Sequence, residues 1–144
     1  LNYLSYRPRS RAEVIIYLEK RNLLENQIRD VVSRLERAGL VDDRAFAAFW
    51  VENRERFRPK GLRALRYELR SKGISEDLIE EALSSIDAEE GAYRAAGRKA
   101  QQVCHLDQRT FHRKLVEYLA RRGFGYEEAR GAAERHWSEL KADE

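Results

Sequence analysis

The chain has 144 residues, of which 42% are hydrophobic and 37% charged, with a formal net charge of +3. Its length suits one ordinary domain, and so high a charged fraction is typical of small helical units with much exposed surface. No stretch is long and apolar enough to cross a bilayer and no signal-peptide pattern is present, so we expect a cytoplasmic protein without a membrane partner. Because the sequence contains no methionine, we interpret it as a fragment that lacks its native start.

Carboxylates are plentiful, but they lie on faces that we expect to be exposed, and the sequence shows no motif for metal binding or catalysis. Cys104 is the only cysteine, which excludes an internal disulfide. It and the three histidines show no spacing typical of metal ligands. A phosphate-binding glycine loop and a nucleophile elbow are both absent from the sequence. We therefore predict a binding protein that is not an enzyme, with no catalytic residues, no metal site and no cofactor.

The N-terminal third of the chain predicts three helices. A short helix ends near Tyr6. The next begins after Ser10, whose spacing to Glu13 is that of a capping box, and it ends at Asn22, the usual substitute for a terminating glycine. The third helix is apolar on one face and ends at Gly39.

An aromatic helix comes next, and either Asp42 or Asp43 can cap it. Phe46, Phe49 and Trp50 then lie at helical spacing. An aromatic stripe of this kind usually belongs to a core, although it could also serve as a stacking platform for bases. We favour the core interpretation.

The central helix has an apolar face and a basic flank. Its apolar face carries Leu62, Leu65 and Leu69. Its basic flank, rotated from that face by about 100°, carries Arg63, Arg66 and Arg70. Gly73 provides the stop, and Ser75 caps an acidic helix that follows. The residue pattern of this one helix therefore predicts both a buried face and a positive surface.

The remaining chain predicts three more helices. A polar helix runs from near Asp87 to Val103, and a break follows at Leu106. The next helix carries a second apolar face and ends at Gly123. In the last helix we expect Trp137 to be a core residue. Since no segment shows strand alternation of useful length, the sequence predicts an all-α fold.

The same pattern occurs three times along the chain, at shifts of 51 and 50 positions. The corresponding positions are Val14, Leu18, Asn22 and Leu23, then Leu65, Leu69, Gly73 and Ile74, then Leu115, Leu119, Gly123 and Phe124. The only two prolines, Pro8 and Pro59, also share one register. Such a period marks repeated supersecondary units, and we predict repeats over residues 1–42, 43–86 and 87–144.

Positive charge gathers in the first two repeats. Residues 1–72 carry 17 basic and 10 acidic residues, a net charge of +7, and the segment 54–72 holds eight basic residues that its two acidic residues offset only weakly. For any one arginine a solvated helix face is the better interpretation, but for the whole set we expect a partner, which is nucleic acid, an acidic protein or a complex of both. The candidate binding residues are Arg7, Arg9, Arg54, Arg56, Arg58, Lys60, Arg63, Arg66, Arg70 and Lys72.

The residues that carry the repeat also resemble those of a known family. The matching elements are Leu4-Ser5 with Arg7, Arg9 and Ser10, Gly39-Leu40-Val41-Asp42-Asp43 with Phe46 and Ala47, and Gly61 with Leu65, Glu68-Leu69, Lys72-Gly73-Ile74 and Ile79. In this combination the chain resembles the RecX family of regulatory proteins. It departs from the family pattern at Asn22, where glycine is usual, and in the third repeat, which has few family landmarks.

This resemblance implies tandem three-helix repeats in an elongated, curved body. It also implies a protein that binds the RecA recombinase and its filament on DNA and restrains ATP hydrolysis, strand exchange and the co-protease function. The setting would be recombination, DNA repair and the SOS response in the cytoplasm, and we expect a monomer.

Two other classes remain open. A helical protein that binds single-stranded DNA without sequence preference would use the same basic residues, with Trp50 or Tyr67 for stacking. Val32 to Val41 also looks like the recognition helix and exit of a winged-helix transcription factor. A wing would require a β-hairpin next, whereas Asp42 and Asp43 lead into a helical pattern, so we rank this class lowest.

Overall fold

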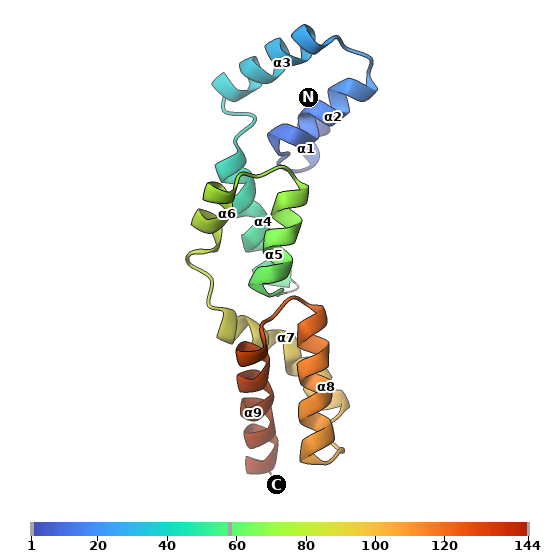
Figure 1. Ribbon diagram of the computed structural model, residues 1–144, viewed down its shortest axis with the longest axis vertical. Coiled ribbons are helices and arrows are strands. Elements are labelled where there is room, and N and C mark those ends of the chain that lie inside the picture. The colour runs from blue at the N-terminus through green and yellow to red at the C-terminus, as the bar shows by residue number, and fades with distance from the viewer. Residues whose placement is uncertain (1, 58, 144) are drawn as a thin grey trace. The chain divides into compact units, whose positions relative to one another are not determined.

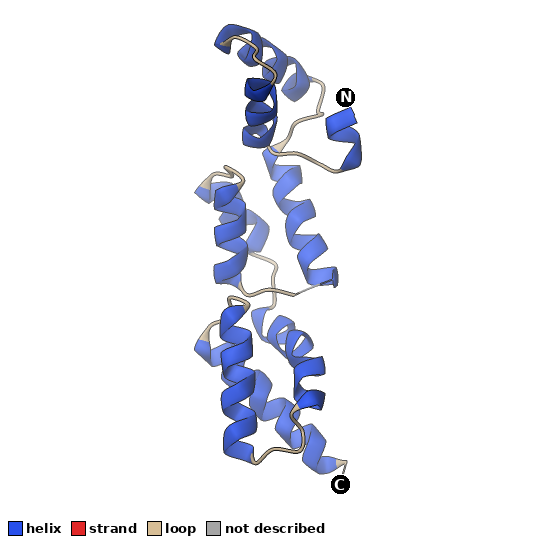
Figure 2. Ribbon diagram, turned by 90° about the vertical axis from the view of Figure 1, so that its right-hand side faces the viewer, coloured by secondary structure: helices blue, strands red, loops and turns tan. Residues whose placement is uncertain are grey.

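The computed structural model describes residues 2–57 and 59–143, and in this part of the chain every regular element is an α-helix (Figures 1 and 2). The elements are α1 (Asn2–Tyr6), α2 (Arg11–Lys20), α3 (Glu25–Arg37), α4 (Asp43–Phe57), α5 (Leu62–Ser71), α6 (Glu76–Leu83), α7 (Ala88–Gln102), α8 (Gln108–Arg121) and α9 (Tyr126–Ala142). The all-α prediction is confirmed. Because α4 begins where a wing hairpin would have to follow, the winged-helix interpretation is wrong.

Contacts between residues divide the chain into two compact units. The first unit comprises Leu1–Glu52 and Glu68–Ser84, and the second comprises Asn53–Tyr67 and Ser85–Glu144. Helices α4 and α5 therefore each contribute residues to both units. The boundaries that we expect between the three sequence repeats stay a prediction.

Each repeat ends its second helix in the same way. The amide after the stop residue donates to a carbonyl five positions earlier, from Leu23 to Leu18 at 3.5 Å, from Ile74 to Leu69 at 3.1 Å and from Phe124 to Leu119 at 3.1 Å. The stop residues have left-handed backbones, with φ of 64° at Asn22, 78° at Gly73 and 89° at Gly123. Asparagine and glycine tolerate this conformation best, so the predicted stops are confirmed at all three positions.

The first unit has a small aliphatic core. Its buried members include Val14 of α2 and Val32 of α3. The entry to α2 is fixed by a capping box, in which the Glu13 amide donates to Ser10 Oγ at 3.1 Å and the Ser10 amide donates to Glu13 Oε1 at 3.0 Å. The predicted capping box is confirmed, and Ser10 is fully buried by it.

The aromatic residues of α4 separate into core and surface. Phe46 is buried, and the Trp50 ring packs on it with centroids 5.7 Å apart. Trp50 Nε1 donates to Glu68 Oε1 at 2.9 Å. Phe49, in contrast, is exposed. The core interpretation is thus confirmed for Phe46, and Phe49 lies outside the core.

The second unit is built on a three-helix core. Helices α7, α8 and α9 pack against one another, and alanines form the buried face of α7. Phe111 of α8 is fully buried, and the Trp137 ring lies against it with centroids 5.2 Å apart. Small side chains on α7 let neighbouring backbones approach closely. Trp137 is partly buried and packs on this core, as predicted.

The cysteine and the buried histidine, for which the sequence predicts no catalytic or metal-binding role, have ordinary environments. His136 Nε2 donates to the Tyr93 carbonyl at 2.8 Å, and Cys104 is an exposed thiol. Among the residues that the structure describes, no group of three or more His, Cys, Asp or Glu side chains is arranged to hold a metal ion. None of the described helices combines the length and the hydropathy that a membrane span needs.

Candidate partner-binding site

The structure distributes the predicted basic residues over both units. Arg7, Arg9, Arg70 and Lys72 belong to the first unit, and Arg54, Arg56, Lys60, Arg63 and Arg66 belong to the second. Arg58 lies outside the described residues. The candidate site therefore consists of two groups of cations, each with its own local environment.

In the first unit, one carboxylate binds two of the cations. The two guanidinium nitrogens of Arg7 contact Glu13 Oε1 at 3.2 Å and Oε2 at 2.6 Å, and Lys72 Nζ contacts Oε2 at 3.2 Å. Both cations also lie over the Trp50 ring, at 5.9 Å for Arg7 and 5.4 Å for Lys72. These contacts hold α2, α4 and the end of α5 together, so Arg7 and Lys72 stabilise the first unit.

The Glu13 cluster also explains why Trp50 is a poor stacking platform. Cations occupy its ring, and its indole nitrogen is bonded to Glu68. A nucleobase would have to displace those contacts before it could stack on the ring. Of the two residues that we considered for stacking, only Tyr67 is exposed, at 74% of its surface.

The charge of Glu13 is stabilised in the folded protein. Burial alone would raise its pKa, but hydrogen bonds from Arg7, the Ser10 amide and Lys72 together hold that pKa below its usual value of 4.5. A carboxyl whose pKa falls on folding stabilises the protein above its unfolded pKa and loses this contribution as the pH falls through the folded value. The cluster should therefore contribute to stability at neutral pH and not in acid.

We accordingly expect Glu13→Gln to lower the free energy of unfolding by about 2 kcal/mol at pH 7, since charge-assisted hydrogen bonds are lost. The difference from wild type should vanish as the pH falls well below 4.5. Urea unfolding at several pH values measures it. Glu36→Gln is the control, because Glu36 forms an exposed 3.6 Å pair with Arg11. An effect of Glu13→Gln that is independent of pH would contradict the assigned ionic role.

Arg9 and Arg70 have separate partners. The Arg9 guanidinium lies 4.1 Å from the Tyr3 ring centroid, and its Nε donates to the Tyr3 carbonyl at 3.1 Å. Arg70 forms an exposed bidentate pair with Glu76, at 2.6 and 3.0 Å. Solvent screens such a pair, so an incoming anion can replace Glu76 at little cost.

These pairs correct one expectation from the sequence. We counted only the two acidic residues inside segment 54–72 as offsetting its positive charge. In the structure Glu13 and Glu76, which lie outside that segment, bind Lys72 and Arg70. The local repulsion is therefore smaller than the composition of the segment suggests, because charges distant in sequence compensate it.

In the second unit the turn before α5 contacts the end of α8. The Gly61 amide donates to the Arg122 carbonyl at 2.9 Å. A Cβ atom at position 61 would lie 2.1 Å from the Gly123 oxygen, and one at position 123 would lie 2.4 Å from the Ala64 Cβ. Two glycines thus allow two backbones to touch, and Arg63 Nη2 adds a 2.8 Å hydrogen bond to the Ala120 carbonyl.

Beside this contact lies a hollow of 390 Å³ that is lined mainly by cationic residues. Its lining consists of Arg54, Lys60, Tyr118, Arg121 and Arg122. We name it the α4–α8 hollow. Arg54 and Lys60 are among the cations predicted from the sequence, whereas the three residues from α8 and its end are not. The signal that could have found Arg122 is the repeat itself, since Arg122 has the register of Lys72 and Arg21.

The carboxylate nearest in sequence to these cations is engaged elsewhere. Glu55 Oε2 accepts a 3.0 Å hydrogen bond from Arg94, whose other nitrogen donates to the Glu55 carbonyl. Burial raises the pKa of Glu55, the charge of Arg94 opposes that rise, and Asp87 adds to it. Glu55 therefore ties α4 to α7.

The other predicted cations of the second unit are surface residues. Arg56 is exposed, with its guanidinium 5.8 Å from the Phe57 ring centroid. Arg66 is half-buried on α5, one turn from Arg63. Arg63 is exposed on the same helix.

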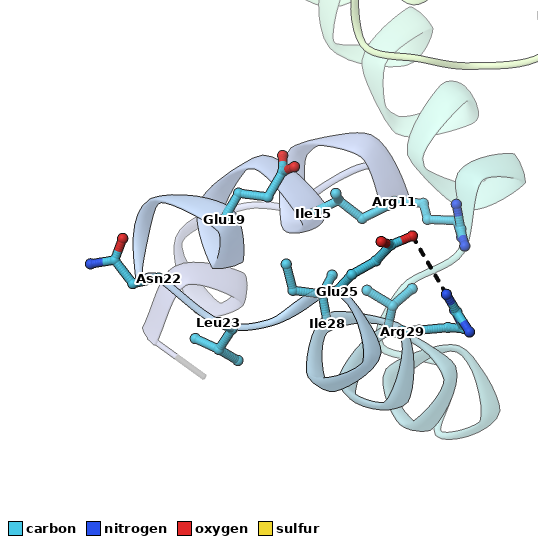
Figure 3. Close-up of a pocket in the computed structure, with 9 residues that line it drawn as sticks. Arg11, Ile15, Glu19, Asn22, Leu23, Glu25, Ile28 and Arg29 are labelled. Carbon is cyan, nitrogen blue, oxygen red and sulfur yellow. Dashed lines mark ion pairs between the residues drawn. The ribbon is translucent and has the colours of Figure 1, made fainter.

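A second hollow, of 660 Å³, lies between α2 and α3 of the first unit (Figure 3). Ile15 and Ile28 give it an apolar lining, and a 3.5 Å pair between Glu25 and Arg29 lies at its rim (Figure 3). Its lining is mixed in charge and contains no histidine or cysteine. It offers neither a metal site nor a concentration of positive charge.

The fold is that of a helical repeat protein, and comparison with known proteins gives the family. Two family models match, namely "RecX, first three-helix domain" over residues 1–35 and "RecX, second three-helix domain" over residues 42–83. The chain belongs to the RecX family.

Individual relatives agree with this assignment. The chain is 41% identical over 124 residues to "Regulatory protein RecX" of Chlorobium phaeobacteroides (strain BS1), covering 86% of this chain and 82% of the relative. It is 39% identical over 127 residues to the protein of the same name from Streptomyces coelicolor, covering 86% and 68%. The crystal structure of RecX from Lactobacillus salivarius superposes with a TM-score of 0.82 at 27% identity, covering 99% of this chain and 92% of that one. The predicted tandem helical repeats are confirmed by these matches.

Proposed function

We propose that the protein binds the RecA recombinase and its filament on DNA and restrains the filament's ATP hydrolysis, strand exchange and co-protease function. It does so as a non-enzymatic regulator in DNA repair and the SOS response. The observation that carries this proposal is the match to both RecX three-helix domains, whose residues include all ten candidate cations. The relatives' shared name, regulatory protein, supports a regulatory role.

The physical basis of the proposed binding is electrostatic. A filament on DNA carries phosphates, and a positive protein surface accelerates encounter with such a polyanion and orients the approach. Arg63, Arg66 and Arg70 recur along α5 at spacings of three and four residues. Residues so spaced share one side of a helix, so the three form a single basic row.

Charge reversal at Arg63, Arg66 and Arg70 should abolish the restraint of RecA-driven ATP hydrolysis. The unfolding temperature should change little, because these side chains are exposed or half-exposed and make surface contacts. The assay measures ATP hydrolysis by RecA on single-stranded DNA against increasing concentrations of wild type or variant.

The matched control reverses Arg29, Arg34 and Arg37 on α3. It makes the same change in net charge at exposed positions outside the candidate site. We expect this control to restrain ATP hydrolysis nearly as wild type does. A folded α5 variant that inhibits at wild-type concentrations would refute the placement of the site. Equal loss in both variants would show dependence on net charge alone.

A further inference from the structure

The hollow of 660 Å³ in the first unit lies on the side of α2 that its own repeat leaves open. We name it the α2–α3 hollow, because all of its lining residues belong to α2, α3 and the turn between them. The remaining helix of this repeat, α1, contacts α2 elsewhere, where Tyr3 stacks on Tyr17 with ring centroids 4.1 Å apart. Tyr17 and Ile15 are two positions apart, so they face nearly opposite directions on the helix. Helix α1 therefore covers the side of α2 away from the hollow.

Helix α2 carries more apolar side chains than the core of its unit uses. Its five consecutive apolar residues, from Val14 to Leu18, point to all sides of the helix. Val14 is buried in the core, whereas Ile15 is half-buried and Ile16 is 52% exposed. A helix that is apolar on every side is typical of one with neighbours on every side. An apolar surface beside a hollow is typical of a contact with another protein.

Along the hollow, α2 presents a base, an aliphatic residue and an acid in that order. Arg11, Ile15 and Glu19 follow one another at intervals of four residues, with Ile15 in the middle (Figure 3). Arg11 forms an exposed 3.6 Å pair with Glu36, and Glu19 forms no ion pair with any residue that the structure describes. A helix that fits this face must therefore present an acid to Arg11, an aliphatic side chain to Ile15 and a base to Glu19.

The α2 helix of a second copy of the chain meets this requirement. In a symmetric dimer the same surface of each copy forms the contact, so that each residue meets its counterpart reciprocally. If two α2 helices pack antiparallel about a two-fold axis at Ile15, Arg11 of each copy lies opposite Glu19 of the other. Both ion pairs then form together, and the two isoleucines meet at the axis.

This order of charges is specific to the first repeat. In the register of Arg11, Ile15 and Glu19, α5 has Leu62, Arg66 and Arg70, and α8 has His112, Val116 and Ala120. Neither of these sets contains an acid, so neither is complementary to itself. The period of the repeat therefore does not account for the order found in α2.

We propose that the first unit binds a second copy of this chain, with α2 of each copy lying antiparallel along the α2–α3 hollow of the other. This inference is independent of the proposed function, and it differs from the monomer that the resemblance leads us to expect. Two short helices bury less surface than a standard interface, and the ion pairs are exposed to solvent. The dimer should therefore dissociate on dilution and at high salt.

Sedimentation velocity of the full chain over a wide range of protein concentrations tests the proposal. Wild type should change from monomer to dimer as its concentration rises. Glu19→Arg alone or Arg11→Glu alone places like charges opposite each other at both contacts. Each variant should weaken dimerisation at least about tenfold, because two attractions are lost and two repulsions replace them.

The two variants should restore association when they are mixed. On this face the Glu19→Arg protein carries two bases and the Arg11→Glu protein two acids, so a dimer of one with the other forms both ion pairs. The equimolar mixture should associate more strongly than either variant alone, and a protein with both substitutions should dimerise like wild type. Glu52→Arg makes the same change in charge at an exposed position on α4, and this control should keep the wild-type behaviour.

The proposal is overturned if wild type is monomeric at every concentration, or if Glu19→Arg dimerises as wild type does. It is also overturned if the mixture associates no more strongly than the separate variants, because Arg11 and Glu19 then do not face each other. Equal loss in Glu52→Arg would contradict it as well, since net charge alone would then control association. Thermal unfolding verifies that each variant is folded. If Arg11→Glu alone unfolds, because it faces Glu36, the protein with both substitutions still decides the result.

Discussion

Gly61→Ala should lower the free energy of unfolding by about 3 kcal/mol, at the upper end of the range for overpacking. The added Cβ would lie 2.1 Å from the Gly123 oxygen and 2.3 Å from the Phe124 amide nitrogen. Both atoms belong to the backbone, so no side chain can rotate away to make room. The turn must move off the end of α8, which also breaks the 2.9 Å hydrogen bond from the Gly61 amide to Arg122. Urea unfolding measures the change.

Gly97→Ala provides the control within the same unit. Gly97 lies inside α7, and apart from its chain neighbours and the backbone of its own helix no described atom lies within 4 Å of the position that a Cβ would take. Alanine there should be neutral or stabilise by about 0.5–1 kcal/mol, since glycine weakens a helix interior. If Gly61→Ala proves as harmless as Gly97→Ala, the close approach of the turn and α8 is wrong, and the α4–α8 hollow does not exist as described.

Leu69→Ala should cost about 2–5 kcal/mol, the range for truncating a leucine in a packed core. Leu69 is fully buried near the end of α5, and its carbonyl accepts the Ile74 amide at the stop. The truncation leaves a cavity on the face that α5 buries, whereas the basic flank of that helix is untouched. Thermal and urea unfolding should both show the loss.

Leu24→Ala is the matched control for this prediction. Leu24 belongs to the same unit but is 65% exposed, so its truncation should change stability by no more than about 0.5 kcal/mol. Equal effects at the two positions would contradict the burial of Leu69, which the repeat pattern predicts, and the exposure of Leu24 in the structure. A Leu69→Ala protein as stable as wild type would contradict it as well.

Local features of this fold could be predicted from the sequence because short-range physics determines them. Asn22, Gly73 and Gly123 mark helix stops by their tolerance of positive φ, and all three adopt it. The spacing of Ser10 and Glu13 predicts the capping box that the structure contains. Leu65 and Leu69, one helical turn apart, are both fully buried.

The candidate site could be predicted only in part, because its geometry depends on contacts between distant residues. Nothing near Glu13 in the sequence indicates that Lys72 binds it. Gly61 and Gly123, whose backbones touch, are also far apart in sequence. Without this contact the sequence does not show that Arg54 and Lys60 lie beside Arg122. The residue types and the period of the repeat identify the cations. Long-range packing then determines which of them form ion pairs and which lie close to one another.

The central claim is that this protein acts on the RecA filament, and equilibrium binding to three targets tests it most directly. Labelled protein is titrated with bare single-stranded DNA, with RecA alone and with RecA assembled on the same DNA. We predict the tightest binding to the assembled filament, with restraint of its ATP hydrolysis over the same range of concentration. Binding to bare DNA that equals or exceeds binding to the filament, with ATP hydrolysis unaffected, would contradict the claim and indicate a free-standing single-strand binder.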